Sequence, residues 1–167
     1  GWGYDLVDAV WQDPQISTHN VSVSGGSEKV KFFAGYSTTK QDGFLENLSY
    51  NKHNVRLNVS AKLSENLDVF GSLSLGTSKK TSATGSSVGD IYGLYRWMLG
   101  WQPDYPVWTE GRLPIDIGWT ANIPAQVRGD AGYIQDNNLR PAMNVSATYK
   151  IPYIKGLSAT ASFSKAY

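Results

Sequence analysis

The chain has 167 residues, of which 41% are hydrophobic and only 17% are charged, with 15 basic and 14 acidic side chains. This near-neutral balance gives no electrostatic reason to expect nucleic acid or a strongly acidic partner. Cysteine is absent, which excludes a disulfide framework and thiolate metal sites. No apolar run approaches the roughly 20 residues that a membrane-spanning helix needs.

The start of the chain, residues 1–17, is predicted to be a surface loop that contains a short helix. The pattern ends before Pro14, because a proline interrupts helical hydrogen bonding. The apolar residues that have the spacing of one helix face are Leu6, Val7, Val10 and Trp11.

Six later stretches alternate apolar residues with small polar or basic residues at a period of two. Successive side chains of a strand point to opposite faces, so each stretch predicts a strand with one apolar and one polar face. A protein core and lipid both produce this alternation, so the medium that covers the apolar face stays open at this point. The expected strands cover residues 18–24, 30–39, 52–63, 67–78, 141–150 and 157–167.

The predicted connections alternate between short and long. Turns at 25–29, 64–66 and 151–156 are short, whereas the connections at 40–51 and 79–140 are longer. Successive connections of an antiparallel sheet lie at opposite ends, so all short turns share one end, as is typical of outer-membrane barrels. The predicted organisation is a surface loop or short helix at 1–17, four strands within 18–78, a long extracellular loop at 79–140, and two strands within 141–167.

Two neighbouring stretches near the start of the chain carry a more specific pattern. They are Trp11-Gln12-Asp13-Pro14 and His19-Asn20-Val21-Ser22-Val23-Ser24-Gly25-Gly26, which continues through residue 33. Together they closely resemble a segment early in the barrel of SusC/RagA-family TonB-dependent outer-membrane transporters. The resemblance extends over most of residues 11–150, and it includes Gln41-Asp42-Gly43, Leu94-Tyr95-Arg96 and Pro103-Asp104-Tyr105-Pro106-Val107.

The resemblance implies an all-β fold, namely an antiparallel up-and-down transmembrane β-barrel segment with one long extracellular loop. This segment would supply about six strands of a larger barrel of roughly 22 strands. The family's plug domain and TonB-contacting segment have no counterpart here, so we expect a fragment of a longer chain. The implied function is import of oligosaccharides or oligopeptides across the outer membrane of Bacteroidetes-type bacteria.

The partners implied by this resemblance are a SusD-like surface lipoprotein that acts as a lid, outer-membrane lipid, and TonB through a region outside this chain. Nucleic acid is not expected as a partner. The energy for import would come from the inner-membrane TonB complex, and no chemistry is expected in this chain.

The long loop holds most of the candidate binding residues. Flat aromatic rings stack on sugars or anchor peptides and partner proteins, and an arginine beside them supplies directional hydrogen bonds. The alternative is that these side chains pack the loop against itself or against the barrel rim. The candidate substrate- or partner-binding residues are Tyr92, Tyr95, Arg96, Trp97, Trp101, Tyr105, Trp108 and Trp119.

A second candidate set lies on the polar faces of the predicted strands. In a barrel these side chains would face the lumen and form a polar, slightly positive wall for a hydrated solute. The alternative is that they hydrogen-bond the plug domain. The lumen-facing candidates are Lys31, Asn54, Arg56, Asn58, Lys62 and Asn144.

No residue pattern predicts catalysis. His19 and His53 stand at strand starts without the serine, cysteine or carboxylate arrangement of a triad or a metal site. We therefore expect no enzymatic role, no cofactor and no metal. Two other functions stay open: a non-TonB outer-membrane porin or adhesin, and a secreted soluble β-sandwich that binds carbohydrate through the aromatic loop.

Overall fold

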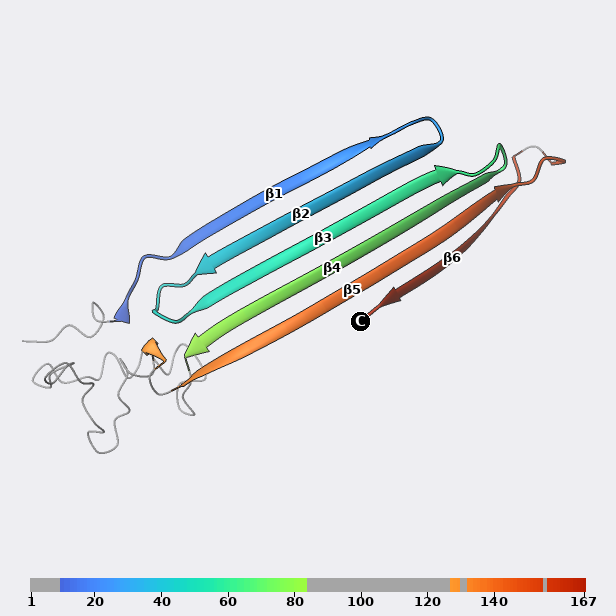
Figure 1. Ribbon diagram of the computed structural model, residues 1–167. Coiled ribbons are helices and arrows are strands. Elements are labelled where there is room, and N and C mark those ends of the chain that lie inside the picture. Colours follow the sequence, from blue (N-terminus) through green and yellow to red (C-terminus); the bar gives the residue numbers. More distant parts are fainter. Residues whose placement is uncertain (1–9, 84–126, 130–131, 155) are drawn as a thin grey trace, which may run out of the picture. The chain divides into compact units, whose positions relative to one another are not determined.

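The computed structural model describes residues 10–83, 127–129, 132–154 and 156–167. These residues form an all-β structure whose strands make a six-stranded sheet (Figure 1). The strands are β1 (Gln15–Gly26), β2 (Val30–Asp42), β3 (Ser49–Lys62), β4 (Leu67–Ala83), β5 (Tyr133–Lys150) and β6 (Ser158–Ala166).

The sheet is antiparallel and has the simplest possible topology. Its strand order is β1-β2-β3-β4-β5-β6, so every strand pairs with its neighbours in sequence. β1 and β6 are the two edges of the described sheet, which is open (Figure 1). The prediction of an all-β, up-and-down antiparallel segment is therefore confirmed, whereas closure into a membrane barrel stays a prediction.

Two connections between strands are shorter than the sequence predicted. β2 continues to Asp42 and β3 begins at Ser49, so the connection expected at 40–51 covers only residues 43–48. The expected loop at 79–140 is likewise too wide, because 79–83 belong to β4 and 133–140 belong to β5. At these strand ends both faces carry polar residues, which removes the alternation although the backbone ladder continues. The β2–β3 connection is therefore short, although the sequence predicted a long one.

The described residues fall into two compact units, which we describe separately. The strand unit consists of Thr18–Thr39, Asn51–Ser78 and Asn137–Tyr167. The connection unit takes its described residues from 10–17, 40–50, 79–83, 127–129 and 132–136.

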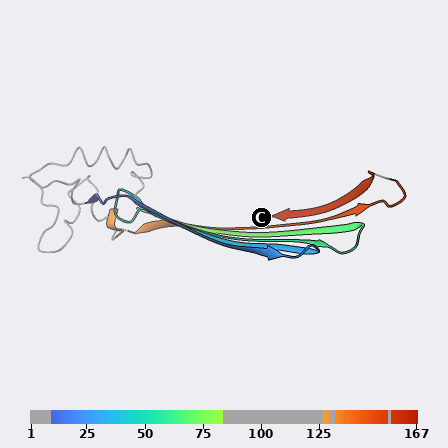
Figure 2. The ribbon, with the colours of Figure 1, turned by 90° about the horizontal axis from the view of Figure 1, so that it is seen from above.

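In the strand unit, the two faces of the sheet differ sharply in polarity. Large apolar side chains alternate out to one face, where their exposed fractions run from 37% for Val55 to 70% for Val21. Figure 2 shows the described strands as a single layer. The exposed apolar residues of this face include Val21, Val23, Val30, Phe32, Tyr36, Val55, Leu57, Val59, Leu73, Leu75, Met143, Val145, Tyr149 and Phe163.

The opposite face of the strand unit is held by cross-strand hydrogen bonds between small polar side chains. Asn54 Nδ2 donates to Ser37 Oγ at 3.2 Å, and Ser72 Oγ donates to Asn58 Oδ1 at 2.9 Å. The edge pair β5–β6 is in register from Ala142 opposite Ala166 to Lys150 opposite Ser158. We refer to this surface as the polar face.

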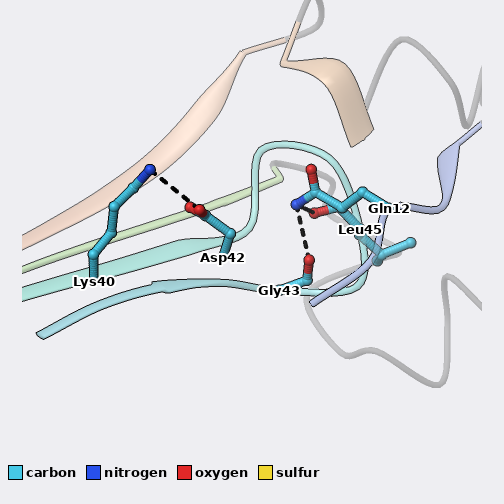
Figure 3. A network of polar contacts seen from close by, with 5 residues as sticks. All are labelled: Gln12, Lys40, Asp42, Gly43 and Leu45. Atoms are coloured by element: carbon cyan, nitrogen blue, oxygen red, sulfur yellow. Dashed lines mark hydrogen bonds and ion pairs between the residues drawn. The ribbon is translucent and has the colours of Figure 1, made fainter. Parts of the chain in front are cut away.

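In the connection unit, a small cluster forms around residues 10–12 and 43–46. Gln12 Nε2 donates to the carbonyl oxygens of Gly43 at 2.8 Å and of Leu45 at 2.9 Å (Figure 3). The Gln12 amide donates to the Phe44 carbonyl, and the Trp11 and Phe44 rings lie 5.1 Å apart. Two of the segments that carry the family resemblance therefore contact each other.

The buried apolar side chains of the described residues, Val10, Leu45 and Val127, all belong to the connection unit. Trp11 forms an isolated antiparallel bridge with Leu45, so the helix predicted to include Trp11 is wrong at this position. Backbone pairing with the β2–β3 connection replaces helical pairing there. The other half of the predicted helix face, Leu6 and Val7, lies outside the described residues. Within the part of the chain that the structure describes, no helix is long and apolar enough to cross a membrane.

Candidate functional site

The predicted aromatic binding residues lie outside the described part of the chain. All of them fall between residues 84 and 126, so their role stays a prediction from sequence. They are Tyr92, Tyr95, Arg96, Trp97, Trp101, Tyr105, Trp108 and Trp119.

The predicted lumen-facing residues all fall in described strands and share the polar face by strand alternation. Asn54 and Asn58 bond to serines on the neighbouring strands. Asn144 is opposite Ser164 in the β5–β6 pair. The structure brings two members of this set together, because Lys31 and Lys62 line the same hollow.

This hollow lies near the ends of β2, β3 and β4 that adjoin the turns β1–β2 and β3–β4. Its volume is about 340 Å³ and it opens on the polar face. We call it the lysine hollow. Its lining residues are Glu28, Lys29, Lys31, Ser60, Ala61, Lys62, Asp68, Val69, Phe70, Ser146 and Thr148.

Backbone pairing explains why residues distant in sequence meet at the lysine hollow. The Lys62 amide donates to the Lys29 carbonyl at 2.7 Å, which joins the end of β3 to the turn before β2. The Lys150 amide donates to the Asn66 carbonyl at 2.8 Å, which joins the end of β5 to the turn before β4. Three hairpins therefore contribute charged residues to one edge of the polar face.

The turn between β1 and β2 is fixed by its own hydrogen bonds. The Ser27 amide donates to the Val30 carbonyl at 2.6 Å, and Ser27 Oγ accepts from the amides of Lys29 and Val30. Gly26 has a φ of 149°, a conformation that other residues rarely adopt. This tight turn, expected from the Gly-Gly pair, places Glu28 and Lys29 beside the hollow.

Around the lysine hollow, positively charged side chains outnumber negatively charged ones. Lys150 Nζ lies 2.7 Å from Asp68 Oδ2, and this ion pair neutralises one carboxylate. The other oxygen, Asp68 Oδ1, is buried and accepts no hydrogen bond from the described residues. With the Asp68–Lys150 pair set aside, three lysines remain against one glutamate in the lining. The hollow therefore carries a surplus of positive charge.

Sequence reasoning missed several residues of the hollow, namely Glu28, Lys29, Asp68, Phe70 and the partner lysine Lys150. Their common signal is a charge, or an aromatic ring at a polar position, within a few residues of a short turn. Ser60, Ser146 and Thr148 add hydroxyl groups, and Thr148 Oγ1 lies 3.0 Å from Thr160 Oγ1.

The two histidines belong to neither candidate set. Tyr36 Oη and His53 Nδ1 lie 2.8 Å apart in a hydrogen bond, and the two rings are stacked with centroids 6.1 Å apart. Among the described residues, no group of three or more His, Asp or Glu side chains is arranged to hold a metal ion.

Comparison with known proteins does not assign the chain to a family. No protein-family model matches the chain, and a search of curated proteins found no match either.

Proposed function

We propose that this chain forms part of the barrel wall of a TonB-dependent outer-membrane importer of the SusC/RagA type. In this proposal the strands of the sheet span the outer membrane, with the apolar face toward lipid and the polar face toward the lumen. Together with a SusD-like surface lipoprotein, the importer takes up oligosaccharides or oligopeptides. TonB drives import through a part of the transporter outside this chain.

The exposed apolar face is the observation that supports this proposal most. Contiguous apolar surface exposed to water favours association and aggregation, so such a face needs a cover. Lipid supplies that cover without a second layer of protein. Strands of 12 to 18 residues among β1–β5 exceed the roughly 9–11 residues that a tilted membrane-spanning strand needs.

The polar face supports the same proposal from the other side of the sheet. Across neighbouring strands, Asn54 donates to Ser37 and Ser72 donates to Asn58, so this face is stable in contact with water or with a polar plug. The residues that carry the sequence resemblance, including Trp11, Gln12 and Gly43, add a family-specific argument that alternation alone does not give.

The experiment that tests this function measures uptake by the intact transporter that contains this segment. Replacing both Trp101 and Trp108 with Ala is expected to weaken oligosaccharide or oligopeptide uptake, or association with the lipoprotein, because stacking surfaces are lost. Barrel assembly should be unchanged. The matched control is Tyr153→Ala, which removes a 94% exposed aromatic ring from the β5–β6 turn.

Unchanged uptake together with unchanged lipoprotein association would remove the aromatic loop from the mechanism. A chain that stays monodisperse in water without detergent would instead favour the soluble carbohydrate-binding sandwich. Uptake that continues without TonB would favour the porin.

A further inference from the structure

We propose that the lysine hollow is a binding site for a small anion that presents carboxylate or phosphate oxygens. The inference goes beyond the proposed import function, because it concerns only the turn-end of the polar face and needs no transport step. It rests on the surplus charge of the hollow, its concave shape and the donors that line it.

Positive charge is left over in the lysine hollow once the ion pair between Asp68 and Lys150 has formed. Asp68 holds Lys150 at 2.7 Å, while Lys29, Lys31 and Lys62 surround the same hollow. The acidic side chains of the lining are Glu28 and Asp68, and Asp68 also attracts Lys62, so the three lysines still outnumber the carboxylates. Like charges held near one another repel, and an anion between them relieves that repulsion. A cation or a neutral ligand would not.

Backbone pairing fixes the positions of Lys29 and Lys62. The hydrogen bond from the Lys62 amide to the Lys29 carbonyl holds the end of β3 beside the turn before β2. Lys31 is the second residue of β2, two positions after Lys29, and it lines the same hollow. The ammonium groups therefore start from neighbouring backbone positions, which lowers the entropic cost of gathering them around one ligand.

The other lining residues of the hollow provide hydroxyl groups and apolar surface. Ser60, Ser146 and Thr148 provide hydroxyl donors, which suit the several acceptor oxygens of a phosphate or a carboxylate. Ala61, Val69 and Phe70 give the hollow an apolar surface beside its polar groups. Beside such a surface water is reduced and charge-assisted hydrogen bonds are stronger.

The test is a titration of the full chain, folded in micelles of a non-ionic detergent whose headgroups carry no phosphate. Inorganic phosphate and the dicarboxylate glutarate are the two probes, and backbone amide NMR shifts of the hollow residues report binding. Saturable shifts at Lys31, Lys62 and Ser146 are expected with at least one probe. Binding should weaken as ionic strength rises. Tighter binding of phosphate would identify a phosphoryl ligand, and tighter binding of glutarate a carboxylate ligand.

A matched pair of variants on β3 tests the location. Lys62→Gln is expected to weaken binding of the tighter probe about tenfold, because one charge-assisted hydrogen bond is lost. Lys52→Gln removes the same charge from the same strand and the same face, away from the hollow, and should change Kd less than about twofold. Lys31→Gln is the second variant if Lys62→Gln fails to fold.

Absence of a saturable shift with both probes, in a chain whose circular dichroism shows the folded sheet, would overturn the proposal. Equal weakening by Lys62→Gln and Lys52→Gln would also overturn it, because only the general charge would then matter. Either result would leave the import proposal unaffected, since that proposal is tested by uptake.

Discussion

At the scale of single residues, neighbouring positions on one strand face different media. Asn144 and Val145 are both exposed and adjacent on β5, yet alternation sends Asn144 to the polar face and Val145, 42% exposed, to the apolar face. Met143 and Ala147 flank Val145 on the apolar face, so this position lies within the apolar band.

We expect Val145→Arg to destabilise the sheet in lipid vesicles by about 2–4 kcal/mol if this position lies near the bilayer midplane. Asn144→Arg, on the other face at the same depth, should cost much less because the arginine stays hydrated. Tyr149→Arg, near the turn, should cost only about 0–1 kcal/mol because the penalty falls toward the interface. Reversible urea unfolding in vesicles measures all three values. Equal losses at Val145 and Asn144 would contradict the assignment of the two faces.

At the scale of elements, cross-strand side-chain pairs hold adjacent strands in register. Thr148 and Thr160 are opposite each other in the β5–β6 pair, and their hydroxyl oxygens lie 3.0 Å apart. Thr18 and Thr39 form a comparable pair between β1 and β2, with a longer oxygen–oxygen distance of 3.4 Å. The two pairs differ mainly in hydrogen-bond geometry.

A double-mutant cycle of Thr148→Val and Thr160→Val should give a coupling energy of about 0.2–1 kcal/mol, the range typical of cross-strand pairs. The same cycle at Thr18 and Thr39 should give less, because hydrogen bonds weaken as the distance grows. The free energy of unfolding of the four variants in each cycle supplies both values. A larger coupling at Thr18 and Thr39 would show that this register does not depend on the hydroxyl contact.

The existence and order of the strands were predictable from sequence, because period-two alternation follows directly from strand geometry. The ends of β4 and β5 were not, since residues such as Lys79, Asn137 and Arg140 are polar whichever face they take. Trp11 was assigned to a helix because its four-residue spacing from Val7 fits one helix face. Only the pairing partner Leu45, distant in sequence, decides between a helix and a bridge.

Only part of the candidate site was predictable from the sequence. Alternation alone places Lys31 and Lys62 on one face, and the structure places both at the lysine hollow. The ion pair between Asp68 and Lys150 depends on the register between β4 and β5, which are separated by the long connection. No local pattern encodes that register, so the neutralised carboxylate was not foreseeable, whereas a slightly positive polar wall was predicted from the strand alternation.

At the scale of the whole molecule, we propose that lipid covers the apolar face of the strand unit. Among the described residues, the buried apolar side chains Val10, Leu45 and Val127 all belong to the connection unit. The strand unit exposes most of its valines, leucines and phenylalanines instead. This arrangement gives a sheet whose stability depends on the medium, because apolar burial dominates folding free energy.

The most direct measurement is nitroxide scanning of β5 in lipid vesicles, one position at a time from Met143 to Thr148. The chain has no cysteine, so each introduced cysteine is the only labelling site. Our account predicts a period of two: labels at 143, 145 and 147 are accessible to oxygen dissolved in lipid, and labels at 144, 146 and 148 to a water-soluble nickel complex. Labels at 143, 145 and 147 that are shielded from both reagents, or accessible only from water, would contradict it.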